Sequence, residues 1–255
     1  MYAEERQLAI AQLVGERGRM SVAEIAERFD VTTETVRRDL SALERMALVR
    51  RVHGGAVPAQ ALAALESGVG ERDRANPTQK HRIAQAALSL LPGPGGVILI
   101  DAGTTTSRFS HELPRGQELT VVTHSVPVAA QLAGSPQIEL HLLPGRVRRS
   151  THAAVGAETV EALSRLRVDV AFVATNGLTL AHGLSTPDAA EAATKRAMVA
   201  AARRVVCLTD STKLGVETTH RFADLTDIDV LVTDADIDDD VAKELRATGL
   251  EVVVA

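Results

Sequence analysis

From residue 96 to its C-terminus, the chain alternates short apolar runs with stretches of helical periodicity. The apolar runs read VILI, LTVV, IELHLL, VDVAFVA, RVVCLT, DVLVT and EVVVA. Helical patterns separate them near 105–113, 126–133, 156–166, 188–202 and 238–248. Strands that alternate with helices become parallel neighbours, because a parallel connection needs a crossover long enough to hold a helix. The sequence therefore predicts an α/β fold with a mainly parallel sheet covered on both faces.

Polar residues follow most of these predicted strands, at the edge where parallel α/β sheets bind ligands. The candidates for a ligand site there are Asp101, Gly103, Thr104, Thr105, Thr123, Ser125, Gly145, Arg146, Asn176, Gly177, Asp210 and Lys213. A glycine followed by backbone amides at a helix start can hold a phosphate, and Lys213 supplies a cation. The set favours a polyhydroxylated, phosphorylated ligand, although a turn and helix cap alone would explain the segment at 101–106 equally well.

Several motifs for nucleotide or metal chemistry are missing. Neither G-x-G-x-x-G nor G-x-x-x-x-G-K-[ST] occurs, which disfavours a dinucleotide or a P-loop nucleotide as the ligand. Cys207 is the single cysteine, so an intramolecular disulfide and a thiolate zinc site are both excluded. Its setting in VVCLTD predicts a buried strand thiol. The histidines show no H-x-x-x-H spacing, and no metal site is predicted.

Two groups of charged residues are interpreted as structural. Glu191 and Lys195 are four residues apart on a predicted helix, which favours an ion pair on the helix face over a ligand contact. The aspartates within 234–240 lack the central glycine and terminal glutamate of a calcium loop. We expect them to stabilise the start of the last helix through its dipole.

The first 57 residues have a different pattern, typical of a small helical module. A first helix is predicted over 3–16, and Ser21 and Glu24 have the spacing of a capping box that begins a second, short helix. After a tight turn, a third helix carries an apolar stripe of Val36, Leu40 and Leu43. Two short helices around such a turn suit a helix-turn-helix, and residues 49–57, with Gly54-Gly55 at the turn, suit a two-stranded wing.

Arginines concentrate on the third helix and the wing. The chain has a net charge of −5, yet residues 37–53 hold five arginines against Asp39 and Glu44. A local basic stripe can contact phosphates even on an acidic protein. The residues predicted to contact DNA are Thr33, Thr35, Arg37, Arg38, Ser41, Arg50, Arg51 and His53. From the adjacent arginines alone, a solvated helix face is the simpler interpretation, and the helices, turn and wing together favour DNA.

Specific motifs make the chain resemble the DeoR family of bacterial transcriptional regulators. In the N-terminal module they are Glu5-Arg6, Val22-Ala23-Glu24-Ile25-Ala26, Thr35-Val36-Arg37-Arg38-Asp39-Leu40 and Arg51-Val52-His53-Gly54-Gly55-Ala56. In the larger domain, the segments that begin at Asp101, Thr123, Thr175 and Asp210 resemble those that surround a phosphosugar effector in the family. Two positions depart from the pattern: His124 stands where Asn is common, and Arg146 where a second glycine is common.

The resemblance implies three segments and a function. Residues 3–57 are expected to form a winged helix-turn-helix, 58–78 a linker with a short helix at 59–66, and 79–255 a sensor domain related to ribose-5-phosphate isomerases and CoA-transferases. The expected function is repression of a sugar-uptake or sugar-catabolism operon, with a phosphorylated sugar as effector and no cofactor. The expected assembly is a homodimer or homotetramer on a double-stranded operator.

Other functions fit the residues less well. An isomerase-like enzyme carrying a DNA-binding domain is the main alternative, but the loop 175–177 lacks the carboxylate base of such isomerases, leaving Asp101, Asp210 and Glu191. An RNA-binding protein is disfavoured because aromatic residues make up 2% of the chain and stacking platforms are scarce. The charged N-terminus and the lack of a long apolar run predict a cytoplasmic protein without a membrane span.

Overall fold

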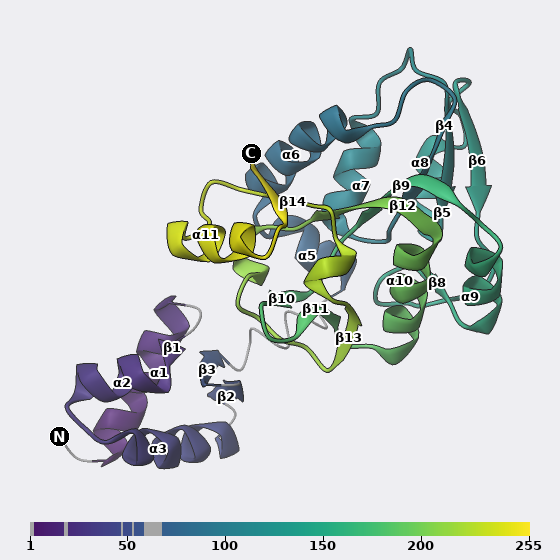
Figure 1. Cartoon of the computed structure of the whole chain (residues 1–255). Helices are drawn as coiled ribbons and strands as arrows, with labels where there is room; N and C mark the ends of the chain where they lie inside the picture. The colour runs from purple at the N-terminus through teal and green to yellow at the C-terminus, as the bar shows by residue number, and fades with distance from the viewer. Residues whose placement is uncertain (1–2, 18–19, 47, 53, 59–67) are drawn as a thin grey trace. The chain divides into compact units, whose positions relative to one another are not determined.

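The computed structural model describes residues 3–17, 20–46, 48–52, 54–58 and 68–255. The chain divides into two compact units, Met1–Ser67 and Gly68–Ala255 (Figure 1). The boundary precedes the predicted sensor start at 79, because residues of the predicted linker fold with the second unit. The short helix predicted at 59–66 lies outside the described residues.

The described residues of the first unit form three helices and a small antiparallel sheet. Its elements are α1 (Ala3–Arg17), β1 (Met20–Ser21), α2 (Val22–Phe29), α3 (Thr33–Arg45), β2 (Val49–Val52) and β3 (Gly55–Pro58). The three strands lie in the order β1-β3-β2. The predicted helices and wing are confirmed, and β1 is an additional strand. Gly55 makes the β1–β3 contact possible, because a Cβ there would lie 2.2 Å from the Met20 carbonyl oxygen.

Local sequence signals begin and end the helices of this unit as expected. The capping box is present: Ser21 Oγ accepts from the Glu24 amide, and the Glu24 carboxylate accepts from the Ser21 amide. Asp30 ends α2 in the left-handed region at φ 50°, and the Thr32 hydroxyl caps α3. The predicted stripe of α3 is fully buried, together with Ile10 and Val14 of α1. This packing directs the opposite face of α3 to solvent.

The second unit is built on a seven-stranded sheet in which every neighbouring pair is parallel. Its strands are β4 (Gly96–Ile100), β5 (Leu119–Thr123), β6 (Ile138–Leu142), β9 (Val168–Val173), β12 (Ala202–Leu208), β14 (Val230–Thr233) and β15 (Glu251–Val254). They lie in the order β15-β14-β12-β9-β4-β5-β6. All seven predicted strands and the mainly parallel α/β architecture are confirmed.

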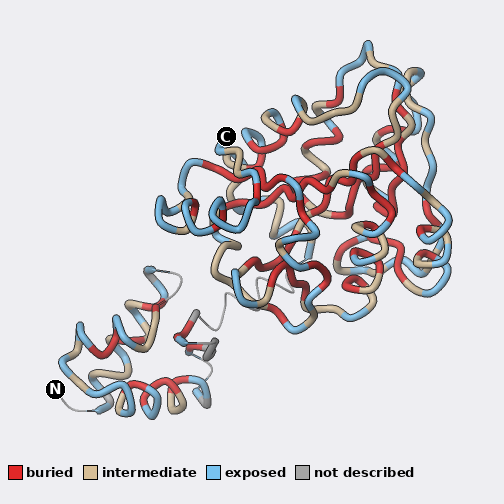
Figure 2. The backbone as a smooth tube through the Cα atoms, viewed as in Figure 1, coloured by how far each residue is buried: buried red, intermediate tan, exposed pale blue. Residues whose placement is uncertain are grey.

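Helices cover both faces of this sheet, and alternate strand residues face the two layers. The helices are α6 (Pro77–Ala87), α7 (Thr104–His111), α8 (Val126–Leu132), α9 (Ala157–Ser164), α10 (Ala189–Ala201) and α11 (Asp239–Ala247). Ile98 and Ile100 pack in one core cluster with residues of α6, α7 and α8, whereas Leu99 packs in the other with residues of α9, α10 and α11. Figure 2 shows the inner strands between these layers as largely buried, whereas the edge strands β6 and β15 are half-buried or exposed.

Five short strands and one short helix of the second unit were not predicted. The strands β10 (Gly177–Thr179), β11 (Gly183–Thr186) and β13 (His220–Ala223) form an antiparallel sheet, and β7 (Arg146–Val147) pairs with β8 (Ala154–Val155). The short helix α5 (Val69–Arg74) lies within the predicted linker 58–78. α6 starts at Pro77, because proline suits the first turn of a helix. No helix within the described ranges is long and apolar enough to cross a membrane.

Candidate functional site

The exposed face of α3 carries most of the predicted DNA contacts. Thr33, Arg37 and Arg38 are exposed, whereas Thr35 and Ser41 are half-buried. The two arginines lie 3.7 and 3.6 Å from the Glu34 carboxylate. Exposed ion pairs of this kind contribute little to stability, so a phosphate or a base edge can replace Glu34 as the partner at small cost. The face is therefore chemically suited to an anionic duplex.

Asp39 belongs to a different environment than its neighbours on α3. It is buried, and it accepts from Arg6 Nε at 2.6 Å and from Gln7 Nε2 at 2.9 Å, both on α1. The hydrogen bond to Asp39 raises the pKa of Arg6. Asp39 thus joins α3 to α1 and its charge is directed inward. By sequence, Asp39 offsets part of the positive charge of residues 37–53. In the structure its carboxylate contacts α1 and does not lie on the exposed face that carries the arginines.

The wing places two further arginines on β2. Arg50 pairs with Val57 and Arg51 with Ala56 in the antiparallel hairpin. Gly54 in the turn has φ 77°, a conformation that glycine adopts without strain. The structure describes only the backbone of Arg50 and Arg51, and His53 lies outside the described residues.

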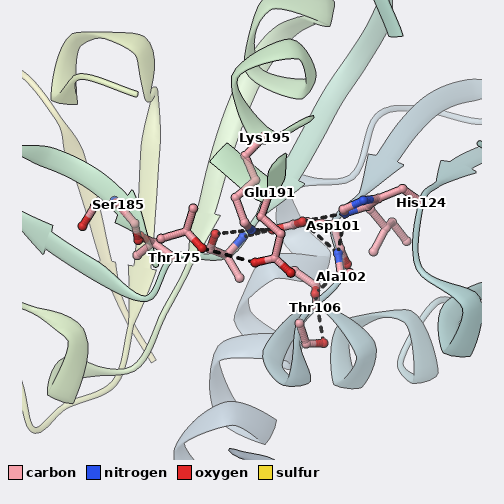
Figure 3. A network of polar contacts seen from close by, with 12 residues as sticks. Asp101, Ala102, Thr106, His124, Thr175, Ser185, Glu191 and Lys195 are labelled. Carbon is pink, nitrogen blue, oxygen red and sulfur yellow. Dashed lines mark hydrogen bonds and ion pairs between the residues drawn. The ribbon is translucent and has the colours of Figure 1, made fainter. Parts of the chain in front are cut away.

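In the second unit, the ends of β4, β5 and β9 meet at Asp101. This carboxylate is fully buried and accepts from the amides of Ala102 and Ala174, each at 2.8 Å. It also contacts His124 Nε2 at 2.9 Å and Lys195 Nζ. Figure 3 shows Lys195 and His124 approaching Asp101 from different sides. Burial by itself would raise the pKa of Asp101, but Lys195 and His124 outweigh it and hold that pKa well below its ordinary value.

The predicted ion pair between Glu191 and Lys195 is wrong. Lys195 reaches Asp101, as described above, whereas Glu191 pairs with Arg148 Nη1 at 2.6 Å and accepts from Thr186 Oγ1 at 3.2 Å. Both side chains are almost completely buried on α10. Helical spacing brings residues four apart together on a solvated face, but here each buried charge has a closer partner on another element.

The start of α7 presents polar groups without a hydrogen-bond partner among the residues that the structure describes. Gly103 is the N-cap and offers no side chain, and the Thr104 and Thr105 hydroxyls form no hydrogen bond within the described part of the chain. A Cβ at Gly103 would lie 3.1 Å from Thr106 Oγ1 and 3.2 Å from Ala174 Cβ. Thr106 is different, because its hydroxyl donates to the Asp101 carbonyl at 2.8 Å. The first turn of α7 therefore offers amides and hydroxyls to an anion.

Other predicted ligand residues have structural contacts. Thr123 Oγ1 donates to the Ile100 carbonyl at 2.7 Å, and Ser125 caps α8. Gly145 has φ 139°, and a Cβ there would lie 2.2 Å from Thr159 Oγ1.

The remaining predicted ligand residues differ in burial. Asn176 and Gly177 are buried at the end of β9, where a Cβ at Gly177 would lie 2.4 Å from the Val216 carbonyl oxygen. Arg146 is exposed on β7 and makes no recorded contact with the Asp101 network in the described ranges.

Asp210 and Lys213 follow β12 in a short 3-10 turn (Ser211–Lys213). Asp210 is buried and accepts from Asn76 Nδ2 at 3.2 Å and from Thr212 Oγ1. Lys213 is half-buried, and no hydrogen bond or ion pair of its ammonium is recorded among the described residues. Of the two side chains, the Lys213 ammonium is therefore the one that is available to bind an anionic ligand.

Sequence reasoning missed two cations, Arg72 in the predicted linker and Lys80 at the start of the predicted sensor domain. Arg72 on α5 lies close enough to Glu191 and Asp101 for their charges to affect its pKa. Lys80 is buried and donates to the carbonyls of Arg72 at 2.5 Å and Ala75 at 2.6 Å. Burial lowers the pKa of Lys80, against the opposing effect of Asp210. The signal for Lys80 was its place on the apolar stripe of α6.

Two other predictions concern thiol and metal chemistry. Cys207 is buried in β12, as predicted, and burial raises its pKa to about 12. The described residues contain no group of three or more His, Cys, Asp or Glu placed to hold a metal ion.

Comparison with known proteins gives matches along nearly the whole chain. A model of the DeoR-like helix-turn-helix domain matches residues 6–61, and a model of the DeoR C-terminal sensor domain matches residues 75–235. The transcriptional regulator GlpR of Haloferax volcanii is 35% identical, covering 99% of this chain and 98% of its own. The transcriptional repressor GlcR of Bacillus subtilis is 30% identical, covering 100% and 97%. Ribose 5-phosphate isomerase A of Methanocaldococcus jannaschii gives a TM-score of 0.41 at 19% identity, covering 55% of each chain.

Proposed function

The chain belongs to the DeoR family of transcriptional regulators, and on that premise we propose that it represses a sugar-uptake or sugar-catabolism operon until a phosphorylated sugar binds. The chain is a DNA-binding regulator with a small-molecule sensor domain. Relatives such as GlpR and GlcR are named as a regulator and a repressor. The observation that carries the proposed effector class is a set of donors at the carboxyl edge of the large sheet that have no partner within the described ranges.

On the DNA side, α3 is the proposed recognition helix. Its first turn exposes Thr33, and the next exposes Arg37 and Arg38, which form weak ion pairs with Glu34. In helix-turn-helix proteins the N-terminal part of the second helix of the motif contacts base edges in the major groove. An arginine there can bind guanine with two hydrogen bonds, while β2 supplies arginines for phosphates.

On the effector side, the proposed phosphate position is the start of α7. The amides at Thr104 and Thr105 and their hydroxyls are donors without recorded partners among the described residues. Lys213, at the end of β12, supplies the proposed cation. Such a combination of helix N-terminus, hydroxyls and ammonium is typical of phosphate binding. Nothing in this proposal requires a cofactor.

The isomerase-like alternative has a physical difficulty. A general base must be able to accept a proton from the substrate. Asp101, the most buried carboxylate at the sheet edge, already accepts from two amides, His124 and Lys195, and its pKa is held low. Glu191 is paired with Arg148. Both carboxylates are therefore engaged in structural contacts, in agreement with the regulatory family.

We also propose that the protein acts as a homodimer or homotetramer. A duplex operator of two half-sites is commonly read by a symmetric protein, because each half-site then meets an identical recognition helix. Sedimentation of the free and operator-bound protein tests this directly. A monomer that binds the operator with full affinity would contradict it.

The experiment for the proposed function begins with genomic fragments that the purified protein retains. A fluorescent duplex made from the retained sequence is then titrated with protein, and the complex with fructose, galactose and glycerol phosphates. Each sugar phosphate is compared with its unphosphorylated parent at the same ionic strength, because DNA affinity falls with added salt. We expect one phosphorylated compound to release the duplex. Equal release by its unphosphorylated parent would show that the effector class is wrong.

A further inference from the structure

Arg72 on α5 is a half-buried cation, and two of its nitrogens have no hydrogen-bond partner among the described residues. Its Nε and Nη2 atoms are buried, and neither has an acceptor among the described residues. Burial lowers the pKa of Arg72, Glu191 and Asp101 oppose that effect, and Arg148 adds to it. A buried guanidinium with unmade hydrogen bonds is costly, because it has lost water without gaining acceptors.

The carboxylates near Arg72 are already engaged by other cations. The Asp101 carboxylate already contacts Lys195 and His124 and accepts hydrogen bonds from two amides. Arg148 pairs with Glu191 at 2.6 Å and with Asp188 at 3.1 Å. None of these carboxylates accepts a hydrogen bond from Arg72 Nε or Nη2 within the described ranges, so both nitrogens remain available as donors. A phosphate would supply the missing acceptors, and the planar fork of arginine fits its oxygens.

α5 itself is held firmly against the sensor unit. Lys80 donates to two carbonyls at its C-terminal end, and the Val69 amide donates to the Ser150 carbonyl at 3.2 Å. Asp73 accepts from Arg108 Nη2 of α7 at 2.8 Å, and Asn76, just after α5, donates to Asp210. These contacts place Arg72 beside the helix that begins at the proposed phosphate position. α5 is also the first described element after the chain that leaves β3 of the DNA-binding unit.

We propose that Arg72 binds the phosphate group of the effector, and that α5 thereby transmits effector binding to the segment that joins the sensor to the DNA-binding unit. This inference rests on the proposed function, since it takes a phosphorylated effector as given. Effector binding supplies the acceptors that Arg72 lacks and so stabilises α5 in its position. A ligand shifts a conformational equilibrium only through different affinities for its states, and a contact between the effector and α5 supplies such a difference.

The first test measures phosphate binding to the full chain by phosphorus NMR, with inorganic phosphate as the probe. Arg72→Gln should weaken binding roughly ten- to a hundredfold, since a hydrogen bond to a charged group is lost. The phosphate affinity of Arg72→Lys should lie between those of the wild type and Arg72→Gln, because lysine keeps the positive charge but lacks the planar guanidinium. Arg74→Gln is the matched control, since Arg74 is exposed on the same helix and should leave the affinity unchanged. Wild-type affinity in Arg72→Gln would overturn the assignment.

A stability measurement separates binding from a structural role. Without phosphate, Arg72→Gln should melt at the wild-type temperature or above it, because an unpaired buried charge is removed. With phosphate, the wild type should gain thermal stability by mass action, and the variant should gain less. A variant that is destabilised without phosphate and gains as much as wild type with it would make Arg72 a structural residue and overturn the proposal.

Hydrogen exchange of the α5 amides tests the transmission. We expect phosphate to slow their exchange in the wild type and in Arg74→Gln, and to leave it unchanged in Arg72→Gln. Phosphate binding without any change in α5 would overturn the transmission. If a sugar phosphate releases the operator from wild type and from Arg72→Gln alike, this inference fails and the proposed function stands. If wild type binds no phosphorylated compound, the proposed function fails first.

Discussion

At the scale of single residues, Arg37 and Arg38 of α3 are available to bind DNA because their ion pairs with Glu34 are weak. Glu34 lies 3.6 to 3.7 Å from both, on an exposed face where such pairs contribute little. We expect Arg37→Ala or Arg38→Ala to weaken operator binding by about 1–3 kcal/mol where the residue contacts a base edge. A phosphate contact would weaken all sequences alike and reduce the salt slope by about one.

Fluorescence anisotropy against operator and scrambled duplex at several salt concentrations measures both effects. Arg82→Ala is the control, since Arg82 is exposed on α6 of the sensor unit. Unchanged operator affinity in both α3 variants would reject α3 as the recognition helix.

Asp101 gives the sensor unit a pH dependence. Its folded-state pKa is depressed, so its contribution to stability is complete above the unfolded pKa of about 3.9 and is lost as the pH falls further. We expect acid to destabilise the wild type in that range. Asp101→Asn should be less stable at neutral pH, because Lys195 loses its partner, and should lose less stability on acidification.

Urea unfolding of the sensor unit, followed at neutral pH and near pH 3, measures this slope. Glu118→Gln is the control, because Glu118 is exposed just before β5 and its side chain makes no hydrogen bond or ion pair within the described ranges. Equal acid slopes in wild type and Asp101→Asn would contradict the assignment.

At the scale of elements, the wing depends on one backbone conformation. Gly54 has φ 77° and nothing within 4 Å of a Cβ there, so a substitution is strained by the backbone alone. Gly54→Val should cost about 1–3 kcal/mol in the hairpin, because a β-branched residue tolerates this region poorly. Gly15→Ala, in α1 with open space around it, should be neutral or slightly stabilising.

Hydrogen exchange of the β2 and β3 amides reports the hairpin, and operator affinity reports its contribution to binding. We expect faster exchange and weaker binding in Gly54→Val, with sequence preference largely preserved. A Gly54→Val protein with wild-type exchange would show that the turn is formed differently.

The elements that sequence predicted are those with a local signal. The seven strands of the large sheet carry continuous apolar runs, because both faces of the sheet are buried. α2 and α3 carry their caps in the sequence. By contrast, β11 pairs with β13 through a contact between residues 184 and 223, and short polar segments that pair at such distance have no local signal. α5 was assigned to a linker because it is only six residues long and buries none of them.

The candidate site was predicted by position more than by role. Parallel strand ends meet at one edge, so Asp101, Thr104 and Lys213 were correctly placed after buried strands. What a side chain does there depends on partners from distant elements. Lys195 was expected to pair with Glu191 and instead neutralises Asp101, and Arg72 gave no signal because its charged neighbours come from β4 and α10.

At the scale of the whole molecule, the proposed regulation requires that two functions be separable by mutation. We take the effector to act through different affinities for the DNA-competent and DNA-incompetent forms. The effector must then lower the affinity for the operator by the same factor by which the operator lowers the affinity for the effector. Lys213→Ala and Thr104→Val should bind the operator as wild type does and respond weakly or not at all to the sugar phosphate. The reason is local: each removes a donor that has no recorded protein partner in the described ranges, so the phosphate loses affinity and the fold loses little.

Arg38→Ala should show the opposite behaviour, losing operator affinity while binding the effector normally by calorimetry. Lys243→Ala serves as the matched lysine control, because Lys243 is exposed on α11 and pairs only with Asp240 in the recorded contacts of the described chain. Titration of the operator complex with sugar phosphate measures the response, and the effector affinity with and without operator measures the reverse effect. The two coupling factors should agree, since linkage makes them equal. If sugar phosphate releases the operator from both Lys213→Ala and Thr104→Val as it does from wild type, the phosphate does not bind at these residues. The proposed ligand class at this edge of the sheet would then be wrong.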